Sequence, residues 1–551
     1  MSNISAINFF SENIGITGFD SENAPFMAFK ELFDNSIDAC NNKAKAEWHD
    51  FPKKIEISVN FENLELDDQA RINIVVRDTG CGIPLESIDL LGTLFGTNKK
   101  INKRDSYYTG QFGVGLKMIL LYATQHGEGN VKVKMRMGNK IWEFSLLCNL
   151  NDGSFYVGNS ESFDHTDWDW ITEFSVSMKM SLGLEYLQEK YFSMELYAKS
   201  CLKKIQSYLV LSKFWNSHIF LNFETNMKMD TSDLIKGNIN LSFFDIFEDN
   251  FVRYSSNKGS KYKIDLVFGF LKEFHVKKEN QVDDIEYLNI DKENQSNLNL
   301  SNTSQTTSLK TGYLYIYRFS NGMPIICKDT EYCDIVTSVK SFIRKKGSSF
   351  GMKLAKKDEL AENNHEKLSI FSGSEFLIPI MVIPTVEFSI RVLFINVKGH
   401  GIQYGTLGKS SLKSNIGLST IIQQSLKSLL KGCQVKFSME LVNIKEFNYK
   451  SSVEKYSPII SKNLASMVMR SDSIVFKNGL FEILSKCDPE NSTNLSDLLE
   501  GSDEEKLREK LNSIFCKWFM NRMEQGSNIK VQAEKDEIDS DEYVFEKEEA
   551  F

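Results

Sequence analysis

The sequence predicts an α+β fold with more than one domain, because strand-like and helix-like stretches follow one another along 551 residues. Residues 54–61 and 72–78 carry β-branched and apolar side chains in the pattern of half-buried strands. Residues 28–37 and 194–211 repeat apolar side chains at the spacing of a helix. A chain of this length predicts about two to four domains.

The composition excludes several classes of protein. Hydrophobic residues make up 41% of the chain, so a sizeable core is feasible. A formal net charge of −9 argues against a surface covered with nucleic acid, although a local basic patch is compatible with it. The nine cysteines form no Cys-x-x-Cys pair and fit a reducing compartment. We see no signal peptide and no membrane-spanning run, so we expect a soluble intracellular protein.

The first motif lies in residues 31–40. Glu31 and Asn35 are four residues apart, so both project from one side of a helix. A carboxylate can polarise a water molecule, and an amide oxygen can complete the ligand shell of a metal ion. Taken alone, the pair also fits a solvated helix face.

Two glycine-rich turns follow. Residues 72–84 read as a strand that ends in a tight turn, where Asp78 can accept a hydrogen bond from an amino group. Glycines in this turn let a flat ring approach the backbone. Residues 108–117 form a glycine-rich loop before an apolar helix at 118–123. Backbone N–H groups at such a helix start bind phosphates, and Lys117 adds positive charge.

Together, and in this order, the three motifs resemble those of the GHKL ATPases, the superfamily of gyrase, heat-shock chaperones, histidine kinases and mismatch-repair proteins. More narrowly, the chain resembles the B subunits of DNA topoisomerase VI, a type IIB topoisomerase. The matching segments are Phe9-Phe10-Ser11-Glu12-Asn13, Gly18-Phe19-Asp20, Glu-Leu-x-x-Asn-Ser-x-Asp-Ala at 31–39 and Gly-x-x-Gly-x-Gly-x-Lys at 110–117.

This resemblance implies a GHKL-type α/β sandwich over residues 21–226 that binds ATP and Mg²⁺. Glu31 would be the general base for the attacking water, Asn35 a magnesium ligand, and Asp78 the acceptor for the adenine amino group. Thr172 would contact the nucleotide, although Ile171 stands where the family has glycine. The other ATP-binding residues that the resemblance implies are Gly82, Asn98, Lys99, Gly110, Gln111, Phe112, Gly113, Val114, Gly115, Leu116 and Lys117.

Residues 91–110 form a basic stretch that reads either as a solvated loop or as a lid drawn in by phosphates. The resemblance places a transducer domain with a ribosomal-protein-like β-α-β fold at 263–435, interrupted by a low-complexity insertion at 276–310. Residues 318–324 match its Arg-Phe-x-Asn-x-x-Pro signature. For Arg318, a structural ion pair and a nucleotide role both stay open.

Residues 397–409 read as a loop with a lysine at its end, and most such lysines are simply surface residues. The loop resembles a transducer loop whose lysine reaches the γ-phosphate, so Lys409 is the second expected catalytic and ATP-binding residue. Gln403 replaces the family's proline. An amphipathic helix near 418–430 either packs on its own sheet or faces a partner.

The remaining segments complete the expected organisation. Residues 1–20 are either a strap to a second subunit or a disordered terminus. Residues 227–262 are a reduced linker where the best-known family members have a helix–two-turn–helix domain. Residues 436–530 are helical, and 531–551 form an acidic, disordered tail.

The resemblance therefore implies an ATP-dependent DNA topoisomerase subunit that dimerises on ATP and gates strand passage through double-stranded DNA. A separate DNA-cleaving A subunit would complete an A2B2 heterotetramer in the nucleus, with no membrane contact. One alternative is a meiotic B-like clamp that holds a break-forming partner on DNA without strand passage. A chaperone-like ATPase is the third interpretation.

Overall fold

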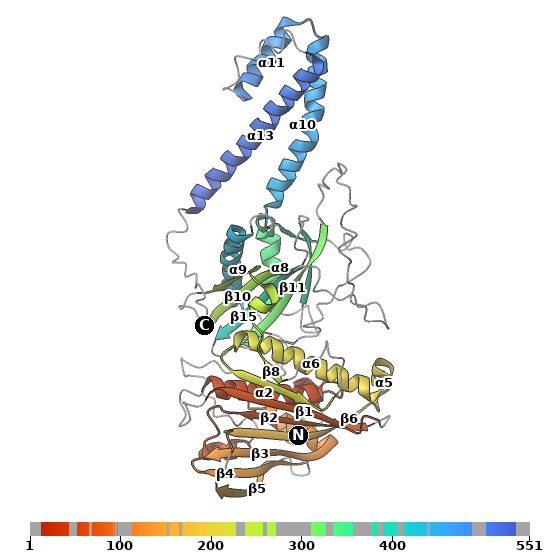
Figure 1. Ribbon diagram of the computed structural model, residues 1–551, viewed down its shortest axis with the longest axis vertical. Helices are drawn as coiled ribbons and strands as arrows, with labels where there is room; N and C mark the ends of the chain where they lie inside the picture. Colours follow the sequence, from red (N-terminus) through yellow and green to blue (C-terminus); the bar gives the residue numbers. More distant parts are fainter. Residues whose placement is uncertain are drawn as a thin grey trace, which may run out of the picture.

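The computed structural model of the protein shows two β-sheets with their helices and a helical projection (Figure 1). No helix in the part of the chain that it describes is both long and apolar enough to cross a membrane. The described residues are 13–42, 52–65, 69–91, 93, 96, 113–150, 154–164, 168–227, 237–256, 262–271, 310–326, 334–355, 376–382, 390–399, 402, 404, 412–413, 415–437, 441–487 and 503–535.

The first sheet has eight strands and is antiparallel except for the parallel pair β1–β7. Its order is β5 (Ser154–Asp164), β4 (Lys140–Asn149), β3 (Gly127–Met137), β6 (Thr172–Ser181), β2 (Gln69–Asp78), β1 (Lys54–Glu62), β7 (Phe220–Thr225) and β8 (Gly237–Ile239). In β1, alternate residues from Ile55 to Phe61 are buried and the residues between them are half-buried. This alternation is typical of an antiparallel sheet with one face covered.

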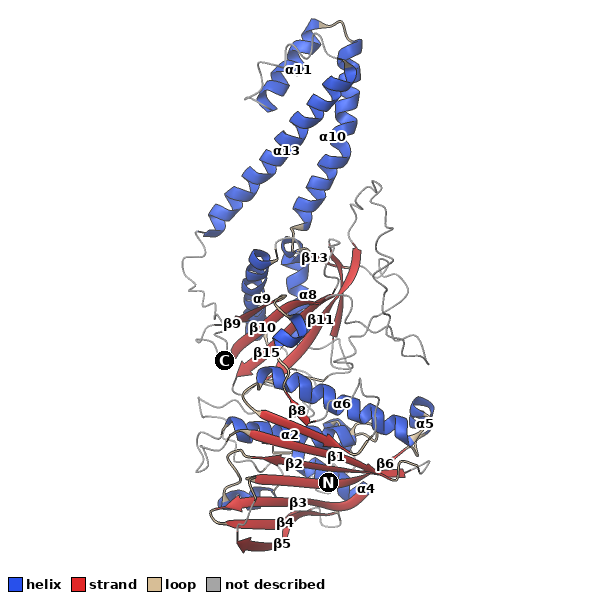
Figure 2. Ribbon diagram, in the orientation of Figure 1, coloured by secondary structure: helices blue, strands red, loops and turns tan. Residues whose placement is uncertain are grey.

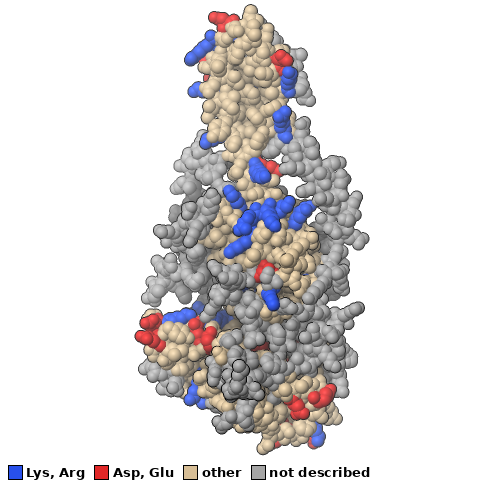
Figure 3. All heavy atoms as spheres, turned by 180° about the vertical axis from the view of Figure 1, so that it is seen from behind, with Lys and Arg blue, Asp and Glu red and all other residues tan. Residues whose placement is uncertain are grey.

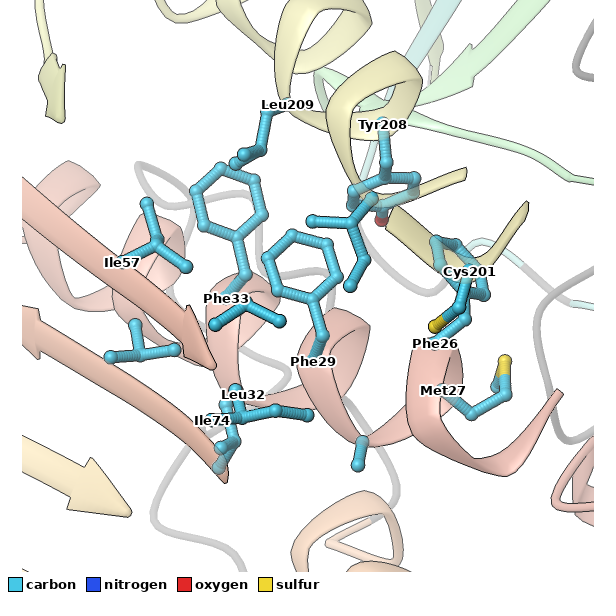
Figure 4. Packing of buried hydrophobic residues seen from close by; sticks show 14 of the residues in the cluster. Phe26, Met27, Phe29, Leu32, Phe33, Ile57, Ile74, Cys201, Tyr208 and Leu209 are labelled. Carbon is cyan, nitrogen blue, oxygen red and sulfur yellow. The ribbon is translucent and has the colours of Figure 1, made fainter. Parts of the chain in front are cut away.

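Helices α2 (Ala24–Asn41), α4 (Gly115–His126) and α6 (Met194–Trp215) cover one face of this sheet (Figure 2). Helix α2 lies between the other two and contacts both. Phe29 and Phe33 stack at 5.6 Å on its buried side, and the Tyr208 ring of α6 meets both edge-on at 6.1 Å (Figure 4). Such aromatic contacts add stability beyond burial of area, so the position of α2 is closely fixed.

The second sheet has seven strands. Its path is β13 (Met352–Leu354), β14 (Phe376–Val382), β11 (Lys310–Ser320), β15 (Ile390–Gly399), β10 (Tyr262–Leu271) and β9 (Phe251–Ser255), with β12 (Met323–Pro324) beside β11. Strands β11 and β15 are parallel, and α8 (Asp334–Lys346) lies between them in sequence. Helices α8 and α9 (Ile416–Lys436) share an apolar core with this sheet. The amphipathic helix near 418–430 thus packs on its own sheet.

The two sheets are joined by one continuous apolar core. β10 is buried along almost its whole length, as expected for a strand covered on both faces. The face of the second sheet turned away from α8 and α9 presents Phe319 and Phe394 to Phe214 and Trp215 at the end of α6. Phe243, in the short helix α7 (Phe243–Phe247), packs on Phe394 at 5.1 Å.

Beyond the second sheet, a helical projection extends away from the first (Figure 1). Helices α10 (Ile444–Arg470) and α13 (Glu504–Lys535) run antiparallel, with Ser457 bonded to Asn512, and α11 (Ile474–Cys487) packs against α13. A separate small core holds them together. The described part of 227–262 is not featureless, because β8 extends the first sheet and β9 extends the second.

Candidate active site

Helix α2 places Glu31 and Asn35 on adjacent turns above the centre of the first sheet. Glu31 is only 7% exposed, and Asn35 is half-buried. Asp34 and Asp38 on the same helix are also buried. A buried carboxylate is costly unless it is paired or hydrogen-bonded. The motif is therefore not a solvated helix face.

The Glu31 carboxylate lies against the start of α4. A Cβ atom built on Gly115, the first residue of α4, would fall 2.0 Å from Glu31 Oε2, so only glycine permits this approach. The first N–H groups of a helix have no partner within the helix and carry partial positive charge. The acidic group and the expected phosphate-binding helix start thus adjoin one another.

Lys30 adds a positive charge beside Glu31. Its Nζ atom is 2.9 Å from Asp34 Oδ2 and 3.6 Å from Glu31 Oε1. Tyr208 donates to the other oxygen of Asp34 at 2.6 Å, and burial raises the pKa of Tyr208 well above its usual range, so this phenol stays protonated. This network connects the Glu31 region of α2 to Tyr208 of α6. No sequence pattern in α6 indicates such a polar contact.

Asp78 ends β2 beneath α2 and is 2% exposed. Its Oδ2 accepts from Ser36 Oγ at 2.9 Å, and its Oδ1 accepts from Gly80 N at 2.9 Å. Two donors of this kind fix the orientation of the carboxylate. An oriented acceptor can distinguish a ligand amino group from a carbonyl.

Gly80 permits the turn after β2 to pass against the backbone of α2. A Cβ atom on Gly80 would lie 2.6 Å from the carbonyl carbon of Ala39, and Cys81 N donates to Ala39 O at 3.1 Å. The next glycine, Gly82, has φ of 71°, which side chains rarely tolerate.

We expect Gly80→Ala to destabilise the first domain, which is built on the first sheet, by about 1–3 kcal/mol, because the backbone of α2 would have to move away. For a domain of this size, that cost corresponds to a fall of roughly 2–10 °C in its thermal unfolding temperature. Gly15→Ala is the matched control, since nothing lies within 4 Å of its added Cβ. Equal unfolding temperatures for the two variants would contradict the close approach.

Thr172 lies directly beside Asp78 in the β2–β6 register and is 3% exposed. The preceding residue, Ile171, is fully buried, and its N–H donates to Asp78 O at 2.9 Å. Its Cγ2 atom occupies the space next to Gly82, at 3.0 Å from where a Cβ would be. The missing family glycine at this position is thus replaced by a side chain that packs against the turn.

The glycine-rich loop leads into α4 through Gly113, which has φ of 62°, and through Val114, which is buried. Leu116 and Lys117 are buried in the first turn of α4, and Lys117 Nζ donates to Gly96 O at 3.2 Å. Lys117 therefore links α4 to the stretch predicted as a lid. Several expected site residues lie outside the described part of the chain: Asn98, Lys99, Gly110, Gln111, Phe112 and Lys409.

Tyr404 and Leu412 are the described residues on either side of the segment that carries Lys409. Tyr404 and Leu412 pair as an antiparallel bridge, and Tyr404 Oη lies 2.8 Å from Ser320 Oγ. Burial raises the pKa of Tyr404 to about 12, and the charges of Lys30 and Asp34 also act on it. Tyr404, on one side of the Lys409 segment, thus lies within electrostatic reach of the helix that carries Glu31.

Sequence reasoning did not assign Ser36, Lys30 or Tyr208 to the site. Ser36 lies inside the first motif, so its position next to Asn35 was an available signal. Tyr208 is 174 residues from Asp34, and only the packing of α6 on α2 brings the two together. Arg318 is 2% exposed and lies over the Phe376 ring, with its guanidinium carbon 6.0 Å from the ring centre.

Comparison with known proteins identifies the domain around this site. Residues 20–149 match the family model described as histidine kinase-, DNA gyrase B- and HSP90-like ATPase. A search of curated proteins found no match. Residues 20–149 thus belong to an ATPase domain of this type, and α2, β2 and α4 all lie within the matched range.

The matches among solved structures include two topoisomerase II structures and one gyrase subunit. The ATPase region of Saccharomyces cerevisiae topoisomerase II bound to ICRF-187 is 12% identical, with a TM-score of 0.35 over 75% of this chain and 85% of that one. The B-subunit of DNA gyrase from Myxococcus xanthus is 10% identical, with a TM-score of 0.39 over 77% of this chain and 95% of that one. The ATPase and transducer domains of Balamuthia mandrillaris topoisomerase II are 11% identical, with a TM-score of 0.35 over 75% of this chain and 85% of that one.

Proposed function

We propose that this chain is the ATP-binding and ATP-hydrolysing B subunit of a type IIB DNA topoisomerase. The observation that carries the proposal is the approach of the buried Glu31 carboxylate to Gly115 at the start of α4. A proton acceptor and a phosphate-binding helix start are then neighbours, as hydrolysis of a terminal phosphate requires.

In this proposal, each residue of the site has one role. Glu31 accepts a proton from the attacking water, and Lys30 holds positive charge beside it. Asp78 accepts the adenine amino group, with its orientation fixed by Ser36 and the Gly80 N–H. The N–H groups at the start of α4 bind phosphate oxygens.

The residues of the site also fit a magnesium ion. Among the described residues, no group of three or more His, Cys, Asp and Glu side chains is placed to hold a metal ion by itself. Mg²⁺ commonly keeps few protein ligands and relies on substrate phosphates for the rest. Asn35, one turn from Glu31 and half-buried, would supply such a ligand, and the ion would offset phosphate charge.

We further propose that Lys409 senses the terminal phosphate. The electrostatic interactions of Tyr404 with Lys30 and Asp34 support this, because Tyr404 flanks the segment that carries Lys409. A cation that binds the γ-phosphate would make the relative position of the two domains depend on nucleotide state. ATP would then close two copies into a dimer around DNA, with cleavage supplied by a separate A subunit in the nucleus.

One observation favours a second candidate, a clamp that holds a break-forming partner on DNA without strand passage. The described part of 227–262 forms only β8, α7 and β9, and no pair of helices in a helix–two-turn–helix arrangement is present among those residues. Relaxation of supercoiled plasmid by the chain with its A subunit separates the two. ATP-dependent relaxation supports the topoisomerase, and DNA binding without relaxation supports the clamp.

A further inference from the structure

The outer face of α8 and α9 is strongly basic. Helix α8 ends with Arg344, Lys345 and Lys346, all exposed. Helix α9 contains three lysines and no Asp or Glu along its 21 residues. The one acidic residue of α8, Asp334, is buried at its start. This face, made by α8 and α9, contrasts with a chain whose net charge is −9.

The charges of this face are not used in structural ion pairs. Within the described part of the chain, Arg344, Lys345, Lys346, Lys427 and Lys431 form no ion pair with an acidic side chain. In the first domain, by contrast, Lys190 and Lys204 both pair with Glu22, and Arg77 pairs with two glutamates.

The two helices present these side chains together. Ser338 of α8 bonds to Ser419 of α9 at 2.8 Å, so the helices lie against each other. Lys427 and Lys431 are one turn apart, on the side of α9 opposite its buried leucines. Seen from behind, Lys and Arg side chains gather over the second domain just below the helical projection (Figure 3).

We propose that this α8–α9 face binds the phosphate backbone of double-stranded DNA. The proposal rests on the proposed function and adds where the chain touches its DNA. A compact row of unpaired cations on an otherwise acidic protein concentrates phosphate binding in one place. Lysine and arginine side chains that contact phosphate oxygens hold a protein on the duplex without reading its sequence.

A lipid surface is the less favoured occupant of this face. A helix that lies on a membrane uses its apolar side to enter the lipid. The apolar side of α9, from Leu418 to Cys433, is already buried in the core of the second sheet. Its large exposed apolar residues, Ile416 and Val435, lie only at its two ends.

The test measures binding of a short fluorescent DNA duplex to the full chain by anisotropy, without nucleotide and over a series of salt concentrations. The test variant combines Arg344→Gln, Lys427→Gln and Lys431→Gln. The logarithm of the binding constant falls with log salt, and each phosphate that a cation no longer neutralises makes this negative slope less steep by about 0.9. For the three substitutions we expect the slope to become less steep by ~2–3 in total. A variant with Lys427→Arg and Lys431→Arg keeps the charge and should keep the slope.

The matched control combines Lys132→Gln, Lys140→Gln and Lys179→Gln, three exposed lysines of the first sheet. An unchanged slope in the test variant, an equal reduction in the control, or binding to phosphatidylserine vesicles but not to the duplex would each overturn the proposal. Basal ATP hydrolysis without DNA is measured in parallel. If the variants show the expected slopes but the wild-type chain does not hydrolyse ATP, the proposed ATPase activity is refuted and this inference still stands.

Discussion

Glu31→Gln is expected to lower the rate of ATP hydrolysis by about 10²–10⁴-fold, because glutamine cannot accept the proton of the attacking water. The side chains have the same shape, so the approach to Gly115 is retained and nucleotide binding should change little. Steady-state phosphate release gives the rate, and titration with a fluorescent non-hydrolysable ATP analogue gives the affinity.

Glu189→Gln is the matched control for this prediction, since Glu189 is an exposed residue of α5 (Glu185–Tyr191). Its hydrolysis rate should equal that of the wild type. A Glu31→Gln protein that hydrolyses ATP at the wild-type rate would show that another group is the base. Loss of both binding and hydrolysis would instead assign Glu31 a structural role.

Asp78→Asn is expected to weaken ATP binding by roughly 10–100-fold, which corresponds to the ~1–3 kcal/mol cost of leaving a buried polar group unsatisfied. An asparagine amide would turn a donor toward either Ser36 or Gly80, or toward the ligand amino group. Discrimination between ATP and GTP should also fall, because guanine presents a carbonyl where adenine has its amino group. Equilibrium titration with both nucleotides measures the two effects.

Ser36→Ala controls for orientation of the carboxylate. It removes the Ser36 donor to Asp78 but leaves the acceptor in place, so affinity should fall by less than in Asp78→Asn while the preference for ATP is kept. If Asp78→Asn bound ATP and GTP with the wild-type preference, Asp78 would not be the group that reads the base.

Much of the fold follows from local patterns. The patterns in residues 54–61 and 72–78 predict β1 and β2, and the helical spacing around Glu31 predicts α2. Strand β5 escapes this reasoning because it is the edge of the first sheet and is largely polar and exposed. Its pairing with β4 depends on the partner strand, which a local pattern does not encode.

Site residues are predictable from the sequence where the interacting side chains lie in one motif. They are not predictable where only the packing of distant segments brings the interacting side chains together. Glu31, Asn35 and Asp78 follow from residue type and spacing. The Lys30–Asp34–Tyr208 network depends on how α6 lies across α2, and a charged residue on a helix normally suggests exposure. The replacement of a family glycine by Ile171 becomes understandable only next to Gly82.

An ATP-operated dimer is tested most directly by the molar mass of the chain, measured by light scattering. The protein is measured with Mg²⁺ alone and with Mg²⁺ plus a non-hydrolysable ATP analogue, beside Glu31→Gln and Lys409→Ala. We expect a monomer without nucleotide, a dimer with the analogue for the wild type and Glu31→Gln, and weaker dimerisation for Lys409→Ala. A chain that binds the analogue and keeps the mass of a monomer would contradict the gate.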